Sequence, residues 1–294
     1  MVTQAGDTLR GRTPRSVLAA RPGLRFALAL IPPLAWLMIA YVGSLAVLLI
    51  SSVWSVDTFT GSVVHTVTID NFKAVFTDPL FRTVTMRTVA VALSVTLLDA
   101  VVAVPLALFM AKVASPRVQI VLMVAVTTPL WASYLVKAYA WRGLLAPNGP
   151  VDWLSGGHSP SYGLTATVIT LAYLWFPYMV LPVFASLQKL PDSLLEAGAD
   201  LGASSVTSLR RIALPLVFPG IAAGSIFTFS LSMGDYIAVT IVGGKTQLLG
   251  NLIYGQLVTA NNQPLAAALS LIPIAAVLAY LFVLRATGTL EDED

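Results

Sequence analysis

Six long apolar stretches dominate this sequence and limit what it can fold into. A helix that crosses a bilayer needs about 20 mostly apolar residues. The stretches are residues 26–50, 84–110, 118–136, 164–187, 216–242 and 265–284. Of the whole chain, 57% is hydrophobic and 11% is charged, whereas a soluble domain carries about 25% charged residues. The sequence therefore predicts an all-α integral membrane protein with six transmembrane helices.

The positions of lysine and arginine predict how the chain is oriented. Residues 1–25 contain five arginines, and basic residues favour the cytoplasmic side of a membrane. The first apolar stretch exceeds the roughly 7 to 15 residues of a signal-peptide core, so it is interpreted as an uncleaved anchor. We thus expect a cytoplasmic segment at 1–25 and a transmembrane domain at 26–284. An acidic tail at 285–294 should return to the cytoplasm.

Residues 188–215, between the fourth and fifth stretches, are polar and are split by glycine. An apolar stripe at helical spacing precedes the split and consists of Leu194, Leu195, Gly198 and Leu201. Gly202 is a typical helix stop, and Ser204 or Ser205 can cap a second helix that leads at Pro215 into the next span. Two short amphipathic helices joined by a bend suit docking to a partner. They could also simply lie among lipid headgroups.

One set of residues in this loop carries a family resemblance: Glu196, Ala197, Gly198, Gly202, Ile212, Leu214 and Pro215. Their spacing resembles the loop signature of permease subunits of ATP-binding-cassette importers. That signature runs Glu-Ala-Ala, three residues, Gly, nine residues, Ile, one residue and Leu-Pro, and Gly198 is the one departure. The resemblance implies a cytoplasmic coupling helix between the fourth and fifth spans, inserted into a groove on a separate ATPase. It further implies a dimer of ATPase subunits, a second six-helix permease, which favours a heterodimer, and an external solute-binding protein.

No residue pattern indicates chemistry performed by this chain itself. The stretch VTIVGGKT at 239–246 has Val239 where a phosphate-binding loop needs glycine. Cysteine is absent, and His65 and His158 lie in separate predicted loops without ligand neighbours at metal spacing. We expect no catalytic residue, no metal and no bound cofactor, with ATP and Mg²⁺ held by the partner ATPase. We also expect no nucleic-acid partner.

Residues 215–270 carry a second resemblance, to spermidine/putrescine-type permease subunits. It rests on Gly234-Asp235-Tyr236, on Gly243-Gly244, on 250–253 and on 262–264. This resemblance implies a polyamine or a similar small cation as cargo. Permeases for ferric iron, phosphonate or sugar remain alternatives. A stand-alone secondary carrier is less favoured, because it would need coupling-ion residues in two related halves.

Five residues are candidates for the translocation pathway: Asp99, Asp235, Tyr236, Trp131 and Tyr134. Carboxylates and aromatic faces both attract ammonium groups, and an acid inside a span faces the protein interior or a wet cavity by default. Other roles stay open. Asp99 could pair with an arginine of a partner or be protonated, Asp235 could cap a helix or brace a gate, and the aromatic residues could form an interfacial belt.

Overall fold

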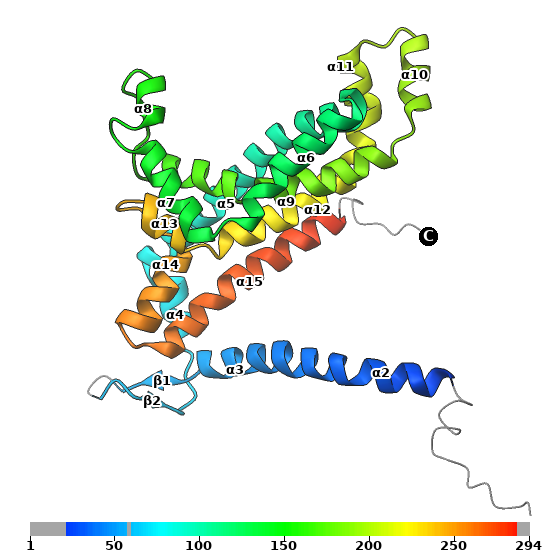
Figure 1. Ribbon diagram of the computed structural model, residues 1–294. Coiled ribbons are helices and arrows are strands. Elements are labelled where there is room, and N and C mark those ends of the chain that lie inside the picture. The colour runs from blue at the N-terminus through cyan, green and yellow to red at the C-terminus, as the bar shows by residue number, and fades with distance from the viewer. Residues whose placement is uncertain (1–21, 58–59, 287–294) are drawn as a thin grey trace, which may run out of the picture. The chain divides into compact units, whose positions relative to one another are not determined.

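The computed structural model describes residues 22–57 and 60–286 (Figure 1). The chain divides into two units, residues 1–51 and 52–294. In the first unit α2 (Pro22–Leu37), η1 (Met38–Val42) and α3 (Gly43–Ser52) follow one another directly. Residues Ala29–Ser52 are long and apolar enough to cross a membrane. The predicted segment 1–25 lies mostly outside the described residues.

The second unit begins with a small hairpin and a short helix. Strands β1 (Ser55–Val56) and β2 (Val63–Val64) are antiparallel, with Ser55 opposite Val64. Helix α4 (Asp70–Thr77) follows, and the Asn71 side chain donates to the carbonyls of Ser52 and Trp54. These bonds fold the start of the unit back onto α4 within the predicted first outer loop.

Three long helices form the core of the second unit. Helix α5 (Pro79–Leu108) continues into the π-helical η2 (Phe109–Val113), and it packs against α9 (Leu164–Lys189) and α12 (Leu214–Met233). A fourth long helix, α15 (Gln263–Ala286), packs against α12. A helix favours residues with fixed spacing on one face, and the largest apolar cluster draws on α5, η2, α9 and α12 together.

Two glycines let α12 approach α9 more closely than other residues would. A Cβ atom added at Gly220 would lie 2.6 Å from the Cβ of Ser186, and one at Gly224 would lie 2.7 Å from the Sδ of Met179. Gly220 and Gly224 are four residues apart, the small-residue spacing that brings membrane helices into backbone contact. The α9–α12 pair is therefore the most closely packed helix pair in the core.

The remaining elements lie at the two ends of this core (Figure 1). At one end, named here the loop end, are α10 (Asp192–Asp200), α11 (Ser205–Ser208) and η3 (Leu209–Ala213). The opposite end carries α7 (Tyr134–Leu145), α8 (Pro150–Leu154), α13 (Ile237–Val242), α14 (Leu249–Tyr254) and η4 (Gly255–Thr259). Helix α6 (Pro116–Trp131) runs between the two ends.

Among the residues that the structure describes, five helices are long and apolar enough to span a membrane, or six if one bent pair counts as a span. The bent pair replaces the single helix expected at 118–136, because α6 ends at Trp131 and the next helix turns away by 105°. The backbone of Ala132 is extended there, and Ser133 is also outside the helical conformation. The span expected at 216–242 also differs, since it runs from Leu209 to Met233. Hydropathy depends on side-chain apolarity, so it predicts neither the bend after Trp131 nor the end of the helix at Met233.

Candidate functional site

Helix α10 is the first half of the predicted docking loop, and it ends at Gly202 as the sequence predicted. Gly202 has a φ of +76°, a left-handed conformation that glycine adopts without a Cβ penalty. The Gly202 N–H donates to the Ala199 carbonyl at 2.8 Å, and the Ala203 N–H donates to the Gly198 carbonyl at 3.0 Å. This pair of bonds is a Schellman motif, which closes the helix and turns the chain.

The second half of the loop begins at α11 and continues without a break into the core. The Oγ of Ser204 accepts from the Thr207 N–H at 3.3 Å, so Ser204 is the cap. The sequence suggested a separate helix before Pro215, but η3 and α12 form one helix, Leu209–Met233. Pro215 has no N–H to donate, and the π-helical turn of η3 ends two residues before it. The loop and the span are therefore one continuous rod.

The signature residues divide into a buried set and an exposed set. Gly198 is buried, and a Cβ atom there would lie 2.7 Å from the Cδ1 of Ile212. The glycine that departs from the family signature is thus in close contact with another signature residue, and together they hold α10 against η3. Glu196 and Ala197 face outward, Leu214 is half-buried, and Pro215 is exposed.

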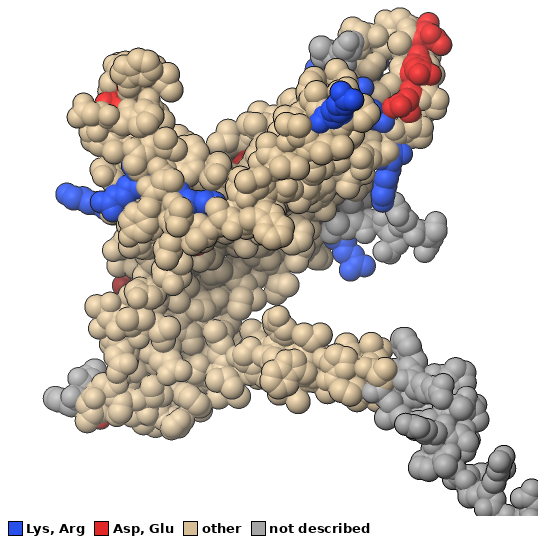
Figure 2. Space-filling view, viewed as in Figure 1, with Lys and Arg blue, Asp and Glu red and all other residues tan. Residues whose placement is uncertain are grey.

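Acidic residues line one edge of α10. Asp192, Glu196 and Asp200 follow each other at intervals of four residues, so they share one helical face. All three are exposed, and they form a red strip along α10 in Figure 2. This edge offers carboxylates to any surface that covers it.

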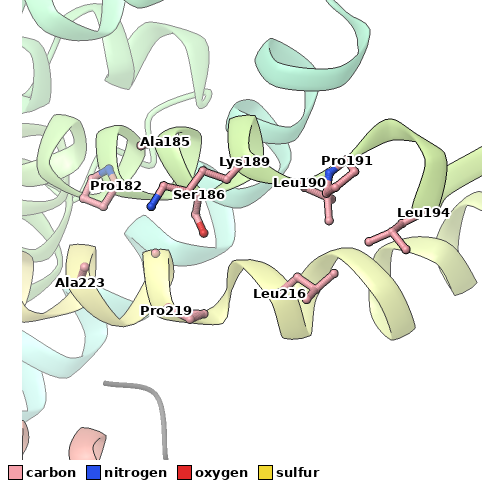
Figure 3. Close-up of a pocket in the computed structure, with 11 residues that line it drawn as sticks. Pro182, Ala185, Ser186, Lys189, Leu190, Pro191, Leu194, Leu216, Pro219 and Ala223 are labelled. Carbon is pink, nitrogen blue, oxygen red and sulfur yellow. The ribbon is translucent and has the colours of Figure 1, made fainter. Parts of the chain in front are cut away.

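A cavity of about 490 Å³ lies beside the loop, between α9 and α12 (Figure 3). Ser186 and Lys189 of α9, Leu194 of α10, and Leu216 and Pro219 of α12 line it. Its walls are mostly apolar, with Lys189 as the charged residue among those that line it. The cavity lies at the base of the loop, where α9 and α12 diverge.

A second cavity, of about 300 Å³, lies at the opposite end and contains three of the five pathway candidates. The Tyr134 hydroxyl donates to the Asp235 carboxylate, whose other oxygen accepts from the Ala238 N–H at 2.9 Å. Tyr236 lines the same cavity. Asp235 is only 8% exposed, so its carboxylate is held by donors rather than by bulk water. We name this group the Asp235 pocket.

Aromatic rings surround the Asp235 pocket. Trp175 lies with its ring centre 5.8 Å from that of Tyr134, and Tyr236 stacks on Tyr254 at 5.0 Å. The indole Nε1 of Trp175 is buried and has no hydrogen-bond partner among the described residues. Nothing in the sequence singled out Trp175, because its spacing does not link it to a turn far along the chain.

Residues 250–251, part of the second resemblance, support the turn that carries Asp235. A Cβ atom at Gly250 would lie 2.8 Å from the Asp235 carbonyl oxygen. The Asn251 amide donates to the Tyr236 carbonyl at 3.1 Å and to the Thr240 hydroxyl at 2.9 Å. These contacts require a small residue at 250 and a side-chain donor at 251.

The other two pathway candidates lie elsewhere. Trp131 is 91% exposed at the end of α6, so it contributes nothing to the Asp235 pocket. Asp99 is 1% exposed within α5, and its Oδ2 has no hydrogen-bond partner among the described residues. One turn away, Thr96 lies 3.4 Å from the Thr228 hydroxyl of α12. Asp99 therefore belongs to a buried polar layer in the core.

Histidines and acids do not assemble into a metal centre among residues 22–57 and 60–286. His65 packs edge-on against Trp54, with 4.3 Å between ring centres. The His158 ring lies 3.1 Å from the Ser155 carbonyl. Both histidines thus make local contacts within their own loops.

Comparison with known proteins identifies the family. The sequence profile described as "Binding-protein-dependent transport system inner membrane component" matches residues 103–289, more than half of the chain. The chain belongs to this family. Both the loop and the Asp235 pocket lie within the matched residues. Membership makes the chain a component of a transport system rather than an enzyme.

Individual relatives agree with the resemblance seen in the sequence. Inner membrane ABC transporter permease protein YdcU of Escherichia coli (strain K12) is 40% identical over 288 residues, 92% of each chain. Spermidine/putrescine transport system permease protein PotB of the same strain is 30% identical over 212 residues, 69% of this chain and 76% of PotB. The predicted resemblance to ATP-binding-cassette importer permeases of this type is confirmed.

A solved structure shares the fold. The crystal structure of a bacterial ABC transporter involved in the import of the acidic polysaccharide alginate contains a chain with a TM-score of 0.74. The match covers 95% of this chain and 99% of that chain, at 16% sequence identity. At that identity the likeness establishes the shared fold alone.

Proposed function

We propose that this chain forms one half of the membrane passage of an ATP-driven importer for a small cation of the polyamine class. The loop at 188–215 docks on a separate ATPase at the cytoplasmic face. The Asp235 pocket lies on the cargo route at the outer face. A second six-helix permease completes the passage, a solute-binding protein outside the membrane delivers the cargo, and this chain itself holds no cofactor.

The division of the signature residues is the observation that carries this proposal. Gly198 and Ile212 are in mutual contact and hold the helix pair together, while Glu196 and Ala197 face outward. The outward edge combines small side chains, which permit close approach, with the acidic strip of α10. A groove lined by basic residues on the ATPase would complement this strip. A helix that merely rests among lipid headgroups would favour basic residues on its polar face, whereas the exposed polar edge of α10 is acidic.

A single helix connects the proposed docking loop to the proposed cargo pocket. The helix Leu209–Met233 has 25 residues, which at 1.5 Å per residue gives a rod of about 37 Å. It starts in η3, within the loop, and ends one residue before Gly234, which lines the Asp235 pocket. Movement of the loop on a closing ATPase would reach the pocket through this rod.

The chemistry of the Asp235 pocket favours a cation. Asp235 supplies a carboxylate in a poorly hydrated site, and Trp175, Tyr134 and Tyr236 supply aromatic faces. Ammonium groups interact favourably with both kinds of group. An anionic or neutral cargo would gain little from the carboxylate, so ferric iron, also a cation, is the alternative that this pocket disfavours least.

Reconstitution tests the proposal directly. The chain would be placed in proteoliposomes with its partner ATPase, second permease and solute-binding protein, and uptake of labelled putrescine and spermidine would be measured with and without ATP. We expect uptake that requires both ATP and the binding protein. Uptake by this chain alone would establish a stand-alone carrier, and selective uptake of a sugar or phosphonate would overturn the cationic cargo.

A further inference from the structure

Lys112 joins the end of α5 to the start of the docking loop. Its Nζ donates to the carbonyl of Leu190 at 2.5 Å and to the Oδ1 of Asp192 at 2.7 Å. Leu190 is the residue that ends α9, and Asp192 is the first residue of α10. One ammonium group therefore connects three helices at the loop end, across about 80 residues of sequence.

The surroundings of Lys112 distinguish it from an ordinary lysine at a membrane edge. Such lysines extend their charged ends toward water or headgroups. The Lys112 side chain is only 12% exposed, whereas that of Asp192 is 74% exposed. The lysine thus reaches inward to the loop, and the aspartate is the partner that remains at the surface. The buried ammonium also satisfies the Leu190 carbonyl, an acceptor in a buried residue.

Apolar contacts around Lys112 join the same three elements. Met110 of η2 belongs to the cluster that contains Leu190 at the end of α9 and Ala213 at the end of η3. Leu195 of α10 and Leu209 of η3 pack against that cluster. Apolar packing therefore holds the loop against the end of α5, and Lys112 adds directional hydrogen bonds to this contact.

We propose that Lys112 is a positioning residue that fastens the docking loop to α5, so that a displacement imposed on the loop moves α5 together with α12. The proposal rests on the proposed function, in which an ATPase displaces the loop. Helix α12 is joined to the loop by the chain itself, through η3. Helix α5 has no such covalent connection, and the bonds of Lys112 supply the link that directs its motion.

Spin labels can measure whether α5 and the loop move together. The chain contains no cysteine, so Val113→Cys and Ser193→Cys introduce two labels, one beside Lys112 and one beside Asp192. Both positions are exposed. The dipolar distance would be measured in the complete complex with cysteine-free partner subunits, without nucleotide and after trapping with ATP and vanadate. We expect the same narrow distance in both states.

Variants of Lys112 then test whether the lysine is responsible. Lys112→Met keeps an apolar stem and removes both bonds, whereas Lys112→Arg keeps the charge and the donors. With Met we expect the trapped complex to lose the wild-type distance, its population falling roughly tenfold relative to displaced forms, the factor for one charge-assisted hydrogen bond. With Arg we expect the narrow distance to return. If Lys112→Met does not assemble, Lys112→Gln, which removes the charge and leaves the acidic strip of α10 unchanged, replaces it under the same criterion.

Two results would overturn the inference. One is a wild-type distance that changes on trapping, because α5 and the loop would then move separately. The other is a Met variant whose label-to-label distance stays as narrow as that of the wild type, because apolar packing alone would then hold the loop against α5. Failure of the ATPase to bind the wild-type chain would instead refute the proposed function, and the inference with it.

Discussion

Replacing Gly202 by valine should uncouple ATP hydrolysis from transport, and the structure gives the size of the effect. Gly202 has a φ of +76°, and a Cβ atom added there would meet nothing within 4 Å. The cost is therefore backbone strain and not a clash. A residue with a Cβ pays about 1–2 kcal/mol in the left-handed region, and a β-branched residue is at the upper end of that range or beyond it.

A cost of about 2 kcal/mol reduces the population of the native bend roughly thirtyfold. Because the bend is exposed and lies outside the helix core, we expect assembly and thermal stability of the complex to change little. Uptake per ATP hydrolysed should fall, since the ATPase would hold a loop whose two helices no longer keep a fixed angle. The assay is ATP hydrolysis and solute uptake, measured together in proteoliposomes.

Two matched variants separate strain from bulk. Gly202→Asn places a residue that tolerates the left-handed region, and it should retain most of the coupling. Gly255→Val adds the same side chain at another glycine with open space around it, but with a φ of −61°, and it should have a small effect. Normal coupling in Gly202→Val would refute the reasoning, because the left-handed bend would then be dispensable.

Three further predictions follow from other contacts. Asp235→Asn should lower uptake of a divalent or trivalent organic cation by roughly tenfold or more while the complex still assembles, because it removes the charge and leaves the shape; equal loss for a neutral solute would contradict this. Gly224→Leu should lower the melting temperature of the complex, since added atoms would collide with Met179 at a cost of about 1–3 kcal/mol, and Gly255→Ala is the unhindered control. Asp99→Asn should reduce cation flux more than assembly, and unchanged flux in a transport assay would make Asp99 purely structural.

The sequence predicted the features that depend on neighbouring residues. Apolar length located four of the six expected spans closely and missed the bend within 118–136 and the shifted bounds of 216–242. The glycine at 202 marked a helix stop that the φ angle confirms. The sequence did not predict that Pro215 would lie inside a continuous helix, because the wider turn of η3 that precedes the proline leaves no pattern in the residue order. The sequence also did not predict the 105° bend after Trp131. Ala132 and Ser133 favour neither a continuous helix nor a bend strongly.

The candidate sites show the same limit. Asp235 and Tyr134 meet across 101 residues, and Lys112 meets Asp192 across 80. The chemistry of Asp235 could be proposed from its type, but its partner could not, because the partner depends on how separate helices pack. Trp131 and Tyr134 are close neighbours in sequence, but a bend lies between them. Because of this bend, Tyr134 lies in the pocket and Trp131 lies at the surface.

The glycine pair on α12 has a consequence for how the passage can open. Where Gly220 and Gly224 meet α9, the α12 backbone lies directly against Ser186 and Met179, so no larger side chain fits between the two helices. We expect α9 and α12 to move together as one rigid body. Gly224→Leu would force the two helices apart. The flexibility that a gate needs must then come from other helix contacts, where longer side chains can slide past one another.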